Sequence, residues 1–237
     1  MTAIAVIFAG GVGRRADVGE MPKQFLTVAG RPIIGHTLAV FADHPQIEGI
    51  YIACVAEWID WLAEYVTQAG FAKVRAIVAG GELAQHSIRH ALDAAAPHWE
   101  DDTIVLVHDA VRPIIDHTLI TAVIAHAARH GNAVTCVPAP ETIVMSEDGE
   151  SATALLQRSR SFIAQAPQAF GLAELRAAHE HYAGVDPEYV DVVDSATLMA
   201  RCGHRIHLVG GRHGNLKVTY PVDVGFLEGY FAAEAER

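Results

Sequence analysis

Short hydrophobic runs alternate with amphipathic segments along the amino-terminal part of the chain. The runs are rich in valine and isoleucine, which is typical of strands buried on both faces. In the segments between them, apolar residues recur every three or four positions, which is the spacing of amphipathic helices. The predicted strands cover 3–8, 50–55, 74–78, 103–107 and 133–138, and the predicted helices cover 33–41, 57–68, 85–95 and about 117–129. This alternation predicts an α/β fold, with a mostly parallel, twisted sheet and helices on both of its faces.

The pattern changes after the fifth predicted strand. Residues 139–166 contain scattered polar residues and a turn signal at Glu147-Asp148-Gly149, so we expect an extended hairpin or arm rather than another β-α unit. Helices near 171–183 and 194–202, a strand at 205–209 and a last helix from 222 complete the prediction. Because no repeat or flexible linker interrupts the chain, we predict one domain over 1–237 with a protruding arm at about 139–166.

The composition is that of a globular protein. Of the 237 residues, 51% are hydrophobic and 19% are charged. No apolar run is long enough and free enough of charge to predict a transmembrane helix. The first apolar run has no basic residues before it and leads directly into glycines. We therefore expect a core strand rather than a signal peptide, and a cytoplasmic protein.

Charge and cysteine content narrow the possible partners. The formal net charge of −11 disfavours a broad surface for nucleic acid or for an anionic membrane, so we expect neither as a partner. The chain has three cysteines, Cys54, Cys136 and Cys202, which lie far apart in the sequence. Their odd number and wide spacing argue against a disulfide framework or a zinc site. Of the positive residues only three are lysines, and two of them, Lys23 and Lys217, lie in motifs that carry chemistry.

A glycine loop, Gly10-Gly11-Val12-Gly13-Arg14-Arg15, follows the first predicted strand. Glycines allow backbone N–H groups to approach a ligand closely, and the arginines add charge that suits phosphate oxygens. The loop also formally fits the dinucleotide fingerprint, although the Gly and Pro residues of 17–22 start a helix poorly. From the loop alone three alternatives stay open: a long phosphate-wrapping loop closed by Pro22-Lys23-Gln24-Phe25, a dinucleotide site, or a simple turn.

Several motifs in a fixed order give a more specific indication. FAGGVGRRADVGEMPKQFL followed by GRPIIGHTL resembles the opening of the cytidylyltransferases of the methylerythritol-phosphate pathway and of their ribitol-5-phosphate relatives. The similarity continues through Gly80-Gly81 with Ser87, HDAVRP at 108–113, APQAF at 166–170 and NLKVT at 215–219. The resemblance implies a Rossmann-like nucleotidyltransferase fold. It also implies transfer of CMP from CTP to a polyol phosphate, with Mg²⁺ as cofactor and pyrophosphate as the second product.

The resemblance also implies roles for particular residues. Arg15, Lys23 and Lys217 match catalytic cations around the triphosphate. The role of Arg14 stays open. The nucleotide-binding positions are Ala9, Gly10, Gly11, Gly13, Gly81 and Ser87, and the substrate-binding positions are Asp109, Arg112, Thr142, Arg158 and Asp194.

Asp109 can also be assessed from its position in the chain. It follows a predicted apolar strand, where open α/β sheets place ligand-binding residues, and a carboxylate there can bind magnesium. Asp109 could instead only pair with Arg112, and both roles can coexist. In relatives the arm reaches into a neighbouring subunit, so the resemblance implies a homodimer in which Thr142 and Arg158 complete the partner's site.

Three features of the sequence bear on the identity of the acceptor. These features resemble the ribitol-phosphate branch of the family: the sequence Ala9-Gly10-Gly11, the spacing of seven residues between Arg15 and Lys23, and the sequence Glu57-Trp58-Ile59. We therefore expect D-ribitol 5-phosphate, with 2-C-methyl-D-erythritol 4-phosphate as the alternative. Two other classes are a nucleotide-binding protein without catalysis and a nicotinamide oxidoreductase. The combination of Arg15, Lys23, Asp109 and Lys217 argues against the first, and the poor helix start after the loop argues against the second.

Overall fold

A seven-stranded sheet forms the centre of the protein in a computed structural model that describes residues 2–10 and 21–236. The strand order is β11-β7-β10-β6-β1-β4-β5, and every neighbouring pair is parallel except those made by β10, which runs antiparallel to both β6 and β7. The predicted α/β class with a mostly parallel sheet is therefore confirmed. The strands are β1 (Ala3–Ala9), β4 (Ile47–Cys54), β5 (Val74–Ala79), β6 (Ile104–Asp109), β7 (Asn132–Pro138), β10 (Phe162–Gly171) and β11 (Leu208–Gly210).

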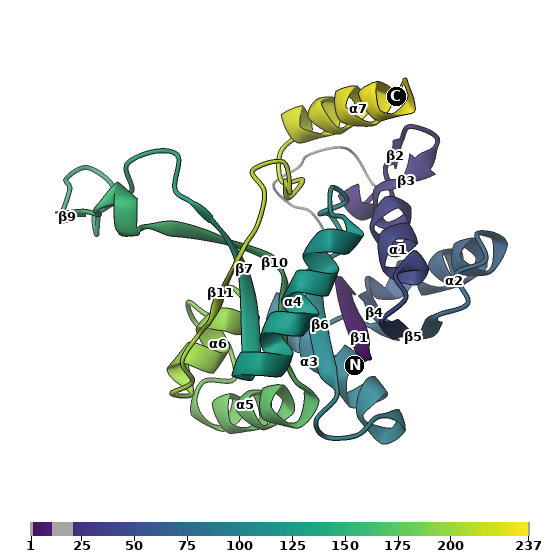
Figure 1. The fold of residues 1–237 in the computed structure, drawn as a ribbon, viewed down its shortest axis with the longest axis horizontal. Helices are drawn as coiled ribbons and strands as arrows, with labels where there is room; N and C mark the ends of the chain where they lie inside the picture. Colours follow the sequence, from purple (N-terminus) through teal and green to yellow (C-terminus); the bar gives the residue numbers. More distant parts are fainter. Residues whose placement is uncertain (1, 11–20, 237) are drawn as a thin grey trace.

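Helices cover both faces of the sheet, because the strands bury apolar side chains on both sides. In β1, Ala5 and Ile7 belong to one apolar cluster, while Ile4 and Val6 belong to the other, as the period of two in a strand requires. The first cluster packs against α1 (Ile33–Asp43), α2 (Ile59–Gln68) and α4 (His117–His130). The second packs against α3 (Ala84–Ala95), α5 (Leu172–Val185) and α6 (Ser195–Arg201) (Figure 1).

The carboxyl-terminal helix α7 (Pro221–Ala235) is not part of these two layers, but it contacts the first of them, because Phe231 stacks on His36 of α1. It packs through Leu227 against Val28 of a small hairpin, β2 (Thr27–Val28) and β3 (Arg31–Pro32), and Figure 1 shows it beside this hairpin. The helix begins where the carboxylate of Asp223 accepts hydrogen bonds from the N–H groups of Thr219 and Tyr220. Among the helices of the described residues, none combines the length and the apolar character of a membrane span.

One central strand escapes the sequence prediction, which places no strand between the arm and the helix near 171. Residues 162–171 form β10, the longest strand of the sheet, and the excursion from the sheet therefore ends before residue 162. Pro167 lies where the register of β10 against β7 shifts, between Ala164 and Gln168. Proline is tolerated at such irregular positions because no ladder hydrogen bond from its nitrogen is required there.

The arm itself forms as predicted, between β7 and β10. It projects away from the sheet (Figure 1) and carries the short hairpin β8 (Val144–Met145) and β9 (Ala154–Leu155), followed by a single helical turn at Arg158–Arg160. Gly149 closes the hairpin turn with φ 76°, and the carboxylate of Asp148 accepts hydrogen bonds from Ser146 and Ser151. Several apolar side chains on the arm are exposed, namely Val144, Met145, Leu155 and Leu156, and so are Phe162 and Ile163 at the start of β10.

Candidate active site

Asp109 lies at the carboxyl end of β6 between two cations. Its Oδ2 is 2.9 Å from Nε of Arg112, and its Oδ1 is 2.5 Å from Nζ of Lys217, which comes from the segment before α7. Burial alone would raise the pKa of Asp109, but Lys217 and Arg112 outweigh this effect and keep the pKa below its ordinary value. Asp109 is therefore an ionised carboxylate held by two cations: Arg112, the partner that the sequence suggested, and Lys217, whose pairing with Asp109 the structure adds.

The neighbouring histidine is a structural residue rather than an acid or base. His108 is fully buried, its Nε2 lies 3.0 Å from the carbonyl oxygen of Arg112, and its ring packs against Phe41. Burial lowers the pKa of His108 to about 4, so the ring is neutral near pH 7. It thereby supports the turn that carries Arg112 without adding charge to the site.

The segment that carries Lys217 is fastened to β10 by buried amides. Asn215 donates from Nδ2 to the carbonyl oxygen of Ala166 at 2.6 Å, and Gln165 donates from Nε2 to that of Arg212 at 3.0 Å. The carbonyl oxygen of Asn215 also accepts from Nη1 of Arg112 at 2.8 Å. Lys217 is thus positioned by the same elements that hold its carboxylate partner.

A cavity of about 200 Å³ opens between these groups and α6. Asp194 lines it and also caps α6, accepting through Oδ1 from the N–H and hydroxyl of Thr197 and through Oδ2 from Gln168. Gln168 in turn accepts from the N–H of Ala196 at 2.9 Å, so that β10 and α6 are locked together. The cavity is lined by Phe8, Ile88, Val107, Asp109, Arg112, Ala164, Gln165, Ala166, Gln168, Val193, Asp194, Ser195 and Lys217.

The predicted nucleotide-binding residues within the described part converge beside this cavity. The hydroxyl of Ser87 accepts from the N–H of Gly81 at 3.0 Å and lies against Gly10, at the end of β1. A side chain at Gly10 would collide with this hydroxyl, and one at Gly80 would lie 3.0 Å from the Cα of Gly10. Only glycine therefore allows the two turns to approach each other so closely.

Of the site residues predicted from the sequence, the remaining ones that the structure describes do not line this cavity. Lys23 begins the short helical turn η1 (Lys23–Phe25), whereas Gly11, Gly13, Arg14 and Arg15 lie outside the described residues. Thr142 and Arg158 are exposed on the arm and do not line the cavity. The structure therefore unites Asp109, Arg112, Asp194 and Lys217, with Ala9, Gly10, Gly81 and Ser87 near them, and separates the two arm residues from this group.

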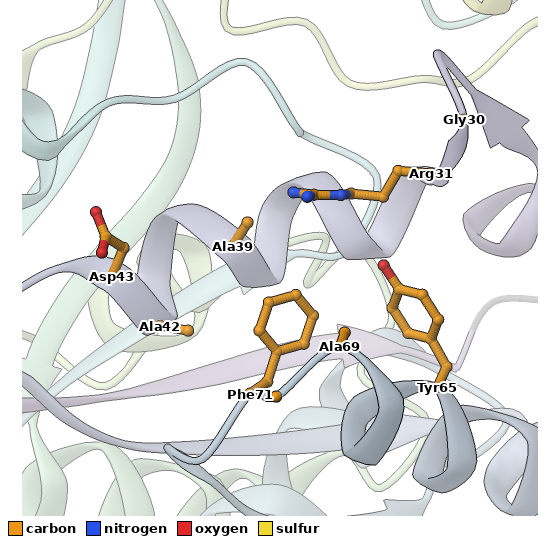
Figure 2. Close-up of a pocket in the computed structure, with 9 residues that line it drawn as sticks. Gly30, Arg31, Ala39, Ala42, Asp43, Tyr65, Ala69 and Phe71 are labelled. Atoms are coloured by element: carbon orange, nitrogen blue, oxygen red, sulfur yellow. The ribbon is translucent and has the colours of Figure 1, made fainter.

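A larger cavity, of about 400 Å³, lies between α1 and α2 (Figure 2). Arg31 and Tyr65 lie at one end, Asp43 at the other, and Phe71 between them. None of the site residues predicted from the sequence lines it. The charged cluster at the ends of β1 and β6 is therefore the better candidate for phosphate chemistry.

Sequence reasoning assigns no role to Gln165, Gln168 or Asn215, although two of the quoted motifs contain Gln168 and Asn215. Each of these amides is buried and joins elements that are distant in the chain. The available signal is that Gln168 and Asn215 lie inside quoted motifs, because amides that become buried need hydrogen-bond partners.

The fold and the site together define a nucleotide-using transferase of the α/β class. Ligands of open α/β sheets bind at the carboxyl ends of the strands, and here two cations, a carboxylate and a close-packed pair of glycine turns meet at that edge. Cations fixed around a cavity stabilise the charge that develops in phosphoryl-group transfer.

Comparison with known proteins identifies the family. The model of the 2-C-methyl-D-erythritol 4-phosphate cytidylyltransferase (IspD) family matches residues 3–233, and the chain belongs to this family. It is a CTP-dependent cytidylyltransferase.

Individual relatives carry two different names. The chain is 40% identical over 233 residues to a ribitol-5-phosphate cytidylyltransferase of Streptococcus agalactiae, covering 98% of this chain and 96% of that one. It is 36% identical over 231 residues to a 2-C-methyl-D-erythritol 4-phosphate cytidylyltransferase of Geobacter metallireducens, with 97% of each chain covered. The crystal structure of the latter enzyme from Thermus thermophilus superposes with a TM-score of 0.75 at 30% identity, covering 98% of this chain and 100% of that one.

Proposed function

We propose that the protein transfers CMP from CTP to D-ribitol 5-phosphate, giving CDP-ribitol and pyrophosphate. The observation that carries the proposal is the 40% identity, over nearly the whole chain, to a relative named for this acceptor. A relative with the same name from Vibrio parahaemolyticus is 36% identical over 220 residues. A CTP-consuming reaction of this kind fits a cytoplasmic protein, which we propose as its location.

The chemistry follows from the charges around the cavity. A phosphate oxygen of the acceptor attacks the α-phosphorus of CTP, forming a new P–O bond while the bond to the β-phosphate oxygen breaks and pyrophosphate leaves. Lys217 provides a cation at the cavity, and Lys23 and Arg15 provide cations along the triphosphate. Such cations stabilise the negative charge that develops on the transferring group. Ser87, Gly81 and the end of β1 hold the cytidine side.

A magnesium ion fits this donor set. Asp109 offers hard carboxylate oxygens at the cavity, and magnesium in nucleotide sites takes one or two carboxylates together with substrate phosphates and waters. Because both oxygens of Asp109 are already paired with Lys217 and Arg112, the ion would share the carboxylate with these cations or displace one of them. The bound ion would neutralise the phosphates as charge moves to the leaving group.

The acceptor would lie on the β10–α6 side of the cavity. Arg112 supplies positive charge for its phosphate, and Asp194 supplies oxygens that accept from polyol hydroxyls. Thr142 and Arg158 would grip that phosphate from the arm of a second copy, in an arm-exchanged homodimer. The exposed apolar residues of the arm support this arrangement, because a second copy would bury them.

A second acceptor has specific support. The family model and the relative of Geobacter metallireducens are both named for 2-C-methyl-D-erythritol 4-phosphate. With that acceptor, the protein would serve isoprenoid synthesis, whereas with D-ribitol 5-phosphate we propose that its product feeds a cell-surface polymer.

Pyrophosphate release with CTP and magnesium decides between the two acceptors when both are supplied at equal concentration. We expect kcat/KM for D-ribitol 5-phosphate to exceed that for 2-C-methyl-D-erythritol 4-phosphate by at least about 100-fold, the discrimination of a site built around particular hydroxyls. Lys217→Ala serves as the inactive control for contaminating enzymes. The reverse preference would assign the protein to the second acceptor, and equal rates would remove the proposed specificity.

A further inference from the structure

The segment that carries Lys23 is anchored to the end of the first strand. The next residue, Gln24, is 2% exposed, and its Nε2 donates to the carbonyl oxygen of Ala9 at 2.7 Å. Ala9 is the last residue of β1, and the following Gly10 lies against Ser87 on the cytidine side. One hydrogen bond therefore joins the strand end beside Ser87 to the turn that presents Lys23.

An aromatic cluster holds the same turn from the other side. Phe25 is 2% exposed and stacks on Trp58 with ring centroids 4.7 Å apart and an interplanar angle of 12°. The edge of Trp61 approaches the same ring, with a centroid distance of 5.1 Å and an angle of 66°. Because α2 and the turn before it supply both tryptophans, Phe25 is fixed to a rigid element.

We propose that Gln24 is a positioning residue for catalysis. Its amide sets the distance between Lys23 and the Ala9–Gly10 backbone, so that cation and cytidine site act on the same bound CTP. The inference rests on the role proposed for Lys23 in the transfer reaction. Glutamine suits this task because its Nε2 donates to a carbonyl oxygen, whereas an ionised carboxylate only accepts.

Two near-isosteric substitutions test the hydrogen bond. Gln24→Met removes the donor, and Gln24→Glu makes donation depend on protonation. A displacement of about 1 Å in a catalytic group can cost about 100-fold in rate, so we expect kcat at pH 8 to fall at least about 10-fold in both variants, with a smaller change in KM for CTP. As the pH is lowered from 8 to 6, the ratio of kcat in Gln24→Glu to kcat in wild type should rise. A buried carboxyl has a raised pKa and, once protonated, donates to Ala9. The corresponding ratio for Gln24→Met should stay flat.

A matched control separates positioning from stability. Asn132 is also a buried amide, and its Nδ2 donates to the carbonyl oxygen of Arg205 at 2.9 Å, at the start of β7 and away from the site. We expect Asn132→Leu to lower Tm while kcat keeps its wild-type value. Wild-type kcat in Gln24→Met, or a flat ratio for Gln24→Glu across the pH range, would overturn the proposal.

Lys23→Ala distinguishes failure of this inference from failure of the proposed function. If Lys23→Ala is inactive and Gln24→Met is fully active, the role of Lys23 stands and only the positioning role of Gln24 is lost. If Lys23→Ala keeps wild-type turnover, the role of Lys23 is wrong and the inference about Gln24 falls with it. Emission from Trp58 and Trp61, recorded in a Trp99→Phe background to remove the third tryptophan, checks that each variant keeps the stacked cluster.

Discussion

Lys217→Ala is the most informative single change, because it separates charge stabilisation in the reaction from charge pairing in the resting protein. Lys217 has two roles in our account: it pairs with Asp109, and it faces the reacting phosphates. The first role affects stability and the second affects turnover. The two effects can be told apart because unfolding and turnover are measured separately.

The expected magnitudes follow from exposure. The Lys217 side chain is 44% exposed but that of Asp109 only 8%, so loss of the ion pair leaves a buried oxygen without its partner and should lower the free energy of unfolding by about 1–3 kcal/mol. Loss of one transition-state donor costs about 100- to 1,000-fold in kcat, or about 3–4 kcal/mol. We therefore expect pyrophosphate release to fall at least about 100-fold in a protein that remains folded at assay temperature.

The pH dependence of stability provides a second measurement on the same variant. Because the pKa of Asp109 is held below its ordinary value, the stability it contributes is present above its unfolded-state pKa and is lost as the pH falls through the folded-state pKa. Lys217 is the foremost of the charges that lower this pKa, so acid unfolding of Lys217→Ala should begin at a higher pH than in wild type.

Lys73→Ala is the matched control for both measurements. Lys73 donates to the carbonyl oxygen of His44 at 2.7 Å, at the opposite edge of the sheet, and its loss should reduce stability without affecting turnover. Turnover within about threefold of wild type in Lys217→Ala would refute the catalytic assignment. An unchanged acid-unfolding profile would refute the pairing with Asp109 as the cause of its low pKa.

Three further changes test other parts of the site. Ser87→Ala removes the acceptor for the N–H of Gly81 and should raise KM for CTP about 5- to 10-fold, the effect of about 1 kcal/mol, with kcat preserved in initial-rate assays. Arg158→Ala should raise KM for the acceptor while CTP affinity, measured by calorimetry, stays unchanged; weakened CTP binding instead would contradict our placement of the arm. His108 and His179 are buried, with pKa values lowered by burial to about 4 and about 3, so the unfolded chain takes up protons first as the pH falls below about 6.5. The free energy of unfolding should therefore rise with pH from about 4 to 6.5, and His179→Phe should reduce that slope in denaturant titrations.

Most of the sheet could be predicted from the sequence because its strands are nearly continuous apolar runs. The Val and Ile residues in 3–8, 50–55 and 103–107 strongly favour buried strands over helices. Asp109 then lies at the end of a strand, where ligands of such sheets bind. The structure confirms these elements and places Asp109 as the strand pattern implied. The local pattern of apolar residues is thus sufficient to predict a strand that is buried on both faces.

The amide network could not be predicted in this way. Gln165, Gln168 and Asn215 look locally like ordinary polar residues, and the partners that join them to other elements lie 26 to 50 positions away in the chain. Only the folded topology brings β10, α6 and the segment before α7 together. The same limit applies to Gln24, whose partner Ala9 lies on the far side of the glycine loop.

The direction of β10 explains why the missed strand matters for the site. β7 ends at the ligand-binding edge of the sheet, where Pro138 leads into the arm, and an antiparallel strand can return from that edge without a crossover helix. Phe162 pairs with Pro138 near the carboxyl end of β7, and Gln168 pairs with Val107 near the carboxyl end of β6, so β10 enters the sheet at the ligand-binding edge. This places Gln165 and Gln168 in the wall of the cavity, while the register shift around Pro167 interrupts the ladder there. A parallel strand in the same position would start at the opposite edge, and the arm could not lead directly into the site.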